Sequence, residues 1–170
     1  PSCNAVVVSL RYGAMRSRSA LQLVLAALTG ILYPFCFPNF DLGWLAWVFL
    51  VPLHAAIGEV PPRRAYWLGW GAGWIGFMGT MGWVVTAMHM YGKMPLLWSY
   101  VALALLASYL GLYVAVYAMT VTWLRRTLPP SALLAAPFVW VTLEFIRTSL
   151  FSGLPWALLG YSQSQWLSAI

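Results

Sequence analysis

The sequence predicts an all-α membrane protein, a polytopic bundle of about five transmembrane helices with a cytoplasmic N-terminus. Its 170 residues are 62% hydrophobic and 7% charged, whereas soluble domains carry about 25% charged residues. Its apolar runs approach the roughly 20 residues that cross a bilayer core. Helices are predicted because lipid offers no partners for the open backbone groups of isolated strands.

Clusters of Pro, Gly or charged residues divide the apolar runs, as expected where helices leave the bilayer. These breaks fall at residues 38–41, 58–64, 92–95 and 125–130. The expected layout is a cytoplasmic segment (residues 1–19), a helix bundle (residues 20–150) and a loop on the outer face (residues 151–170). The expected spans are residues 20–37, 42–57, 65–90, 96–124 and 132–150.

The distribution of basic residues predicts the orientation. A cytoplasmic N-terminus places seven of the nine basic residues inside, and only Lys93 and Arg147 remain for the outer side or the membrane. This agrees with the excess of Lys and Arg in the cytoplasmic loops of membrane proteins. The seven are Arg11, Arg16, Arg18, Arg63, Arg64, Arg125 and Arg126.

Helix packing and the membrane interface account for the glycines and tryptophans of the runs without a catalytic role. Gly69, Gly73 and Gly76 share one face of the third run, and small residues let helices approach closely in lipid. Tryptophans near the ends of runs, such as Trp67 and Trp123, are typical of the membrane interface.

The positive charge does not indicate nucleic-acid binding. The formal net charge is +6, but no basic stripe is interleaved with exposed aromatic residues. We expect no cofactor and no metal. Cys3 and Cys36 form no CxxC pair. His54 and His89 fall toward opposite ends of their spans, too far apart to share a haem iron.

Glu144 and Arg147 form a candidate pair within the membrane. They are three residues apart on one predicted helix, so their side chains can meet. Charges at such depth are costly and often functional. The alternative is a neutralising pair that holds the fifth helix against its neighbours, and the sequence leaves both interpretations open.

The segment from Phe151 to Gln163 is too broken by Gly and Pro for a span, yet too aromatic for a free linker. On the outer face it would lie at the lipid surface, with Trp156 and Tyr161 at headgroup depth. A plain interfacial anchor is the alternative.

Motifs spread from about Leu21 to Gln163 resemble the apolipoprotein N-acyltransferases of bacterial inner membranes. The most specific run in order along the last third of the chain. They are residues 136–140 (APFVW), 144–147 (EFIR), 153–156 (GLPW) and 160–163 (GYSQ), and earlier matches are residues 37–41, 94–95 and 107–113.

The resemblance implies an enzyme of lipoprotein maturation in the nitrilase superfamily. Such enzymes move an acyl chain from a phospholipid, through a thioester on a cysteine, to the α-amino group of the diacylglyceryl-cysteine that begins a lipoprotein. The bilayer, the phospholipid donor and the lipoprotein acceptor are the implied partners, and the loop would be periplasmic. Trp156, with Gly153, Pro155 and Tyr161, matches a family element associated with lipid and substrate entry.

The resemblance also implies that catalysis belongs to a nitrilase-like domain with a Glu-Lys-Cys triad, which we expect to be absent from this chain. Cys36, Lys93 and Glu144 have the right residue types, but none stands in the family's catalytic context. No catalytic residue is therefore predicted here, and we expect the fragment to be inactive alone.

A non-enzymatic membrane protein, such as a small transporter or a scaffold subunit, is the alternative. Transporters usually show internal repeats, and no repeat is found in this sequence. A downstream reading frame that encodes a domain with Glu, Lys and Cys would favour the enzyme.

Overall fold

The computed structural model describes residues 3–37, 40, 42–150 and 153–163, which form helices and turns without a strand. This confirms the predicted all-α class. The long helices are α1 (Cys3–Leu32), α3 (Pro62–Thr80), α5 (Leu96–Thr127) and α6 (Ala136–Ser149). The shorter ones are η1 (Tyr33–Cys36), η2 (Gly43–Trp47), α2 (Val51–Ala56), α4 (Trp83–Thr86), η3 (Ala87–Tyr91), η4 (Pro130–Ala135) and η6 (Leu159–Gln163).

Prolines mark several helix boundaries. Pro62 begins α3, and Pro95 immediately precedes α5. Proline suits the start of a helix, where its missing N–H would have no partner in any case. At the other end of α5, Leu128 is extended before Pro129, because a residue that precedes proline is disfavoured in helical conformation.

Three of the apolar runs are interrupted in the structure. Residues 42–57 divide into η2 and α2, with Pro52 in the first turn of α2. The run at residues 65–90 divides at Met81 and Gly82 into α3, α4 and the π-helix η3. The run at residues 132–150 begins as the 3-10 helix η4 before α6, which has Pro137 in its first turn. These breaks follow from proline and glycine, which disfavour the helix interior.

Two segments are long and apolar enough to cross a membrane, namely Ser17–Cys36 and Leu96–Thr127. Gly43–Ala56 is apolar but shorter. The described helices therefore suit a membrane protein, and the count of about five spans stays a prediction.

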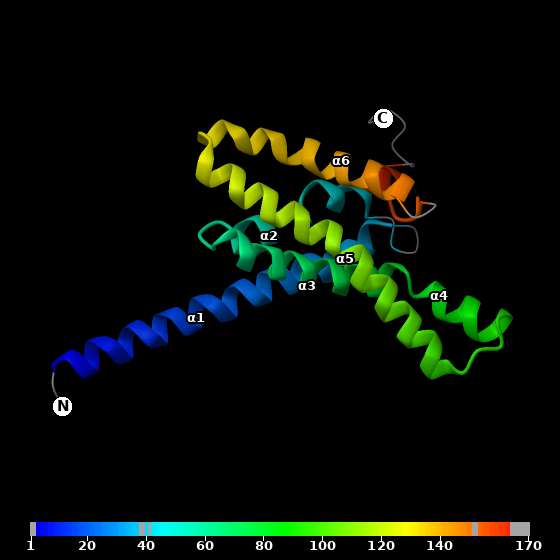
Figure 1. Ribbon diagram of the computed structural model, residues 1–170, viewed down its shortest axis with the longest axis horizontal. Coiled ribbons are helices and arrows are strands. Elements are labelled where there is room, and N and C mark those ends of the chain that lie inside the picture. The colour runs from blue at the N-terminus through cyan, green and yellow to red at the C-terminus, as the bar shows by residue number, and fades with distance from the viewer. Residues whose placement is uncertain (1–2, 38–39, 41, 151–152, 164–170) are drawn as a thin grey trace.

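Helix α3 packs between α1 and α5, and α6 lies against α5 (Figure 1). Glycines allow the close approach. A Cβ at Gly73 would lie 2.9 Å from the Cα of Gly111 on α5, and one at Gly76 would lie 3.1 Å from the ring of Tyr33. At Gly71 the same atom would meet nothing within 4 Å. Gly73 and Gly76 thus serve packing, as expected of small residues at helix contacts in lipid.

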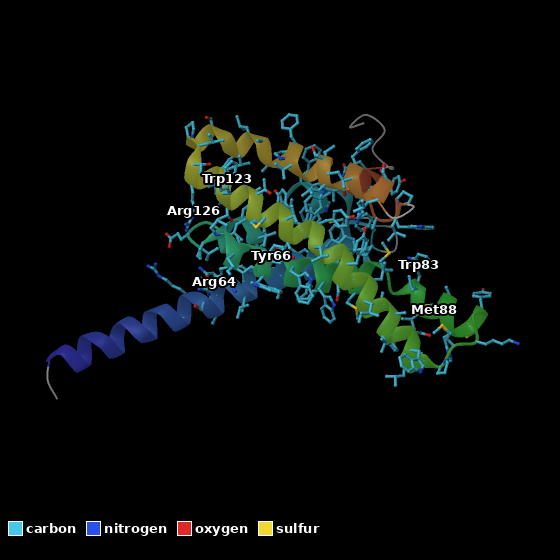
Figure 2. The ribbon with its side chains drawn as sticks, in the orientation of Figure 1. Arg64, Tyr66, Trp83, Met88, Trp123 and Arg126 are labelled. Carbon is cyan, nitrogen blue, oxygen red and sulfur yellow. The ribbon has the colours of Figure 1, made fainter. Side chains whose placement is uncertain are left out.

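The two ends of the molecule differ. The turn between α2 and α3 and the turn between α5 and α6 lie at one end, where Figure 2 shows Arg64 and Arg126. Helix α4 and residues 153–163 lie toward the other end (Figure 1). Aromatic side chains fill the core between them. The ring of Tyr33 packs against those of Phe49 and Phe77, with centroids 5.4 and 5.3 Å away, and Trp140 packs on Phe49 at 5.7 Å.

Candidate functional site

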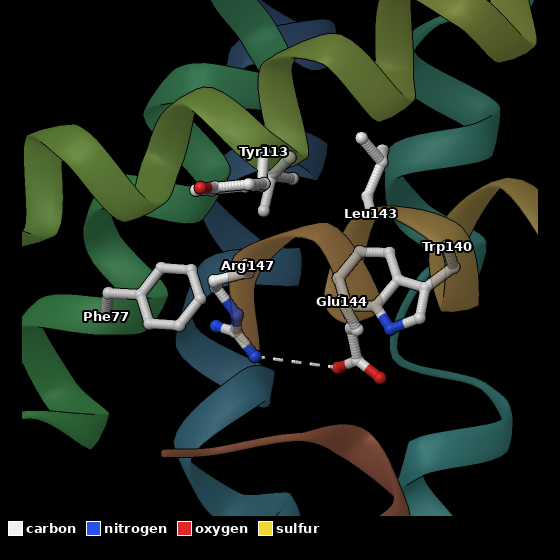
Figure 3. Close-up of a pocket in the computed structure, with 7 residues that line it drawn as sticks. Phe77, Tyr113, Trp140, Leu143, Glu144 and Arg147 are labelled. Atoms are coloured by element: carbon white, nitrogen blue, oxygen red, sulfur yellow. Dashed lines mark ion pairs between the residues drawn. The ribbon is translucent and has the colours of Figure 1, made fainter. Parts of the chain in front are cut away.

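The site centres on an ion pair in the second half of α6. The Nη2 atom of Arg147 lies 3.8 Å from Oε1 of Glu144 (Figure 3). The side chain of Arg147 is 3% exposed and that of Glu144 is 16% exposed. The guanidinium also lies over the ring of Phe77, 5.3 Å from its centroid. The spacing of three residues brings the two charges together on one helix face.

Both charged side chains also bind the segment Gly153–Gln163, which we call the return loop. Oε1 of Glu144 accepts a hydrogen bond of 2.8 Å from the backbone N–H of Leu159. Nη2 of Arg147 donates to the carbonyl of Ala157 at 3.2 Å. The pair therefore does more than neutralise charge, because it also ties the return loop to α6.

Tyr33 is a third member of the site. Its buried hydroxyl donates a hydrogen bond of 2.7 Å to the carbonyl of Ala157, the same oxygen that Arg147 binds. Sequence reasoning missed Tyr33, which comes from the end of the first apolar run. The available signal was a tyrosine within an apolar run, directly before Pro34. A phenol that is buried there usually finds a hydrogen-bond partner.

Two residues of the return loop have a positive φ angle. Gly153 has φ +76°, and a Cβ there would collide with the carbonyl of Thr148. Glycine is therefore required at this position. Ala157 has φ +55°, which is unfavourable for a residue with a Cβ. The hydrogen bonds from Tyr33 and Arg147 to the carbonyl of Ala157 help to hold this conformation.

The far end of the return loop is tied to η2. Nε2 of Gln163 donates to the carbonyl of Gly43 at 2.8 Å. A side chain at Gly43 would collide with the carbonyl of Ser162, so the two backbones are in close contact. The return loop is thus attached at its middle and at its far end.

Aromatic side chains of the return loop remain exposed while its backbone is held. Trp156 is 55% exposed and Tyr161 is 53% exposed. The indole of Trp156 packs against that of Trp83 in α4, with centroids 5.1 Å apart. Pro155, the residue before Trp156, is exposed as well. The four predicted loop residues therefore lie in one tethered segment, with Trp156 presented at the surface.

A pocket lies beside the ion pair, between α3, α5 and α6. Trp140 and Tyr113 form part of its wall (Figure 3). Its remaining lining residues are Phe77, Val114, Leu143, Glu144 and Arg147. Most of these residues are apolar or aromatic, and the ion pair forms the charged part of the lining.

The histidines lie apart from this site. Nε2 of His54 is 2.9 Å from the hydroxyl of Tyr117, and Nδ1 of His89 is 2.8 Å from the carbonyl of Met94. Among the described residues, no three His, Cys, Asp or Glu side chains gather where they could hold a metal.

Fold and site together define a helical module of membrane type with a tethered aromatic loop. A comparison with protein families matches residues 29–170 to the apolipoprotein N-acyltransferase N-terminal domain. The matched residues include Tyr33, the ion pair and the return loop. The chain belongs to the apolipoprotein N-acyltransferase family.

Individual relatives agree with this assignment. The chain is 39% identical to the apolipoprotein N-acyltransferase of Geobacter metallireducens over 149 residues, which cover 86% of this chain and 28% of that protein. It is 34% identical to the apolipoprotein N-acyltransferase of Azotobacter vinelandii over 142 residues, which cover 82% of this chain and 28% of that protein. It is 31% identical to that of Vibrio parahaemolyticus over 143 residues, which cover 81% of this chain and 28% of that protein. The chain spans somewhat over a quarter of each relative.

Proposed function

We propose that this chain is the membrane module of an apolipoprotein N-acyltransferase. The complete enzyme transfers an acyl chain from a phospholipid to the α-amino group of the N-terminal diacylglyceryl-cysteine of a lipoprotein. The acyl chain passes through a cysteine thioester in a nitrilase-like domain that carries a Glu-Lys-Cys triad outside this chain. Family membership supports this function and favours it over a transporter or a scaffold subunit.

The role of the module is to guide lipid substrates toward the catalytic domain. The observation that carries this role is an indole held outward by a fixed loop. Trp156 is 55% exposed, while Ala157 next to it is fixed by Tyr33 and Arg147. An indole offers an apolar body and an N–H donor, which suit an acyl chain near its ester group. Gly153 and Pro155 shape the loop, and Tyr161 contributes a second exposed ring.

A chimaeric enzyme tests this function. Residues 29–170 should replace the matching segment of the Geobacter metallireducens enzyme with retention of acyl transfer to a lipoprotein. The control chimaera carries the Azotobacter vinelandii segment, which is also an apolipoprotein N-acyltransferase. If the control transfers acyl chains and the chimaera with this module is inserted in the membrane but inactive, the proposed function is wrong.

The proposed topology has about five spans in a bacterial inner membrane, with a cytoplasmic N-terminus and a periplasmic return loop. The basic end and the return loop lie at opposite ends of the molecule (Figure 1), which supports it. The domain layout is the one expected from the sequence, with residues 1–19 cytoplasmic, residues 20–150 in the bundle and residues 151–170 periplasmic. Of the last segment, the structure describes residues 153–163.

Cysteine labelling in intact cells checks this orientation. In a chain without its native cysteines, Gly160→Cys should react with a membrane-impermeant reagent, because Gly160 is exposed and has open space around it. Ser131→Cys, exposed near the basic end, should be shielded until the cells are opened. Ser162 is a poorer reporter, because it is buried and bonded to Leu159. The reverse labelling pattern would show that the module is inserted the other way.

A further inference from the structure

The basic end of the molecule carries charges that the proposed acyl transfer does not use. Arg63 and Arg64 lie in the first turn of α3, and Arg126 lies in the last turn of α5. All three are exposed. Because α3 and α5 pack against each other in opposite directions, these turns share one end of the molecule, where Figure 2 shows Arg64 and Arg126.

Within the described residues, no carboxylate pairs with this cluster. The chain has three acidic residues, of which Glu59 lies next to α3 and pairs with Arg18 of α1 at 3.4 Å. Glu144 lies on α6 in the ion pair with Arg147. Nη1 of Arg125 donates to the carbonyl of His54 at 3.0 Å, so this side chain is directed toward the protein. No hydrogen bond or ion pair is found for the side chains of Arg63, Arg64 and Arg126 within the described residues.

Exposed tryptophans lie one helical turn from these arginines. Trp67 follows Arg63 by four residues on α3 and is 60% exposed. Trp123 precedes Arg126 by three residues on α5 and is 54% exposed. Residues three or four apart lie on the same helix face. Each helix therefore presents a cation at its tip and an indole one turn deeper, toward the apolar middle of the bundle.

We propose that Arg63, Arg64 and Arg126 bind the headgroup phosphate of an anionic phospholipid, with Trp67 and Trp123 against its glycerol and upper acyl chains. Guanidinium groups bind phosphate oxygens bidentately, and basic residues next to membrane helices attract anionic lipids. The apolar rings one turn deeper favour a lipid over a free phosphate or a nucleic acid. The inference rests on the proposed membrane embedding and is separate from the acyl-donor lipid at the other end.

The parent chain, purified in detergent, tests this by native mass spectrometry with dioleoyl phosphatidylglycerol and dioleoyl phosphatidylethanolamine. We expect the anionic lipid to bind at least about tenfold more tightly, because each basic residue near an anionic headgroup contributes roughly fivefold. Arg63→Gln, Arg64→Gln and Arg126→Gln together should reduce its affinity to that of the zwitterionic lipid. Lys93 is exposed in the turn between η3 and α5, and this turn lies at the opposite end of the molecule (Figure 1). Lys93→Gln should therefore leave the preference intact.

Equal binding of the two lipids by the parent, or an unchanged preference in the triple variant, would overturn the proposal. The double variant Trp67→Ala with Trp123→Ala should bind the anionic lipid several-fold more weakly, although the charge of the protein is unchanged. Displacement of the lipid by inorganic phosphate at equal concentration would show a phosphate site, and tighter binding of an RNA oligonucleotide would show a nucleic-acid site. If the triple variant loses its helical circular dichroism, the test is made on the parent chain at low and high salt. High salt should reduce its preference for the anionic lipid, and a preference that does not change with salt would overturn the proposal.

Acyl transfer by the chimaeric enzyme is measured independently of this binding. If the parent chain binds the two lipids equally while the chimaera transfers acyl chains normally, the lipid site alone is refuted. Inactivity of the chimaera with an intact preference refutes the proposed function alone.

Discussion

Replacement of Arg147 by alanine should destabilise the protein by about 3–5 kcal/mol, the cost of leaving one member of a buried ion pair without its partner. The carboxylate of Glu144 would lose its cationic partner and keep its hydrogen bond from Leu159. The carbonyl of Ala157 would also lose a donor. The measurement is the free energy of unfolding in detergent micelles, together with the amount of protein in the membrane.

The double variant Glu144→Ala with Arg147→Ala separates the two roles of the pair. If the pair only neutralises charge, the double variant should be nearly as stable as the parent. Since both side chains also hold the return loop, we expect it to be milder than the sum of the single changes, yet more sensitive to proteolysis at residues 157–160. Strict additivity would contradict any interaction between the two charges.

A second arginine–glutamate pair provides the matched control. Arg18 and Glu59 lie 3.4 Å apart, with side chains 76% and 84% exposed. Exposed ion pairs contribute little because water and salt screen them. Arg18→Ala should therefore leave the melting temperature close to that of the parent, and a loss as large as that of Arg147→Ala would show that burial is not the cause.

Replacement of Trp156 by alanine in the complete enzyme should lower acyl transfer to lipoprotein by roughly tenfold or more, equivalent to about 1.4 kcal/mol of lost binding to the transition state. The melting temperature should stay near that of the parent, because Trp156 is 55% exposed and its indole packs on the similarly exposed Trp83. The hydrogen bonds of Leu159 and Gln163 involve neither indole.

Two further variants identify what the indole contributes. Trp156→Phe keeps an aromatic ring and should recover part of the activity if apolar contact dominates. Trp98→Ala removes an indole that is 58% exposed in the first turn of α5, and should leave acyl transfer unchanged. Protein that is lost in proportion to activity would instead make Trp156 an interfacial anchor.

Composition and local spacing predicted much of this structure. The apolar runs at residues 20–37 and 96–124 correspond to the two segments that could cross a membrane. The spacing of Glu144 and Arg147 was sufficient to predict that their side chains can meet, and they lie 3.8 Å apart. Both results depend on interactions within one helix, which a sequence records directly.

Contacts between distant residues were not predictable in the same way. Tyr33 and Ala157 are 124 residues apart, and Gly43 and Gln163 are 120 residues apart. These hydrogen bonds depend on how η1 and η2 pack against the return loop, which no local pattern encodes. The positive φ of Ala157 was equally hidden, because alanine gives no sign of that conformation. Pro52 within the second run, by contrast, was a visible signal that the run is divided.

The rate of thioester formation from phosphatidylethanolamine, measured in a single turnover separately from transfer to the lipoprotein amine, tests most directly whether the fixed return loop handles the lipid donor. For Trp156→Ala in the complete enzyme, we predict a thioester rate reduced roughly tenfold or more, with the amount of folded protein unchanged. A thioester rate and a transfer rate both equal to those of the parent would contradict the role of Trp156 in substrate handling.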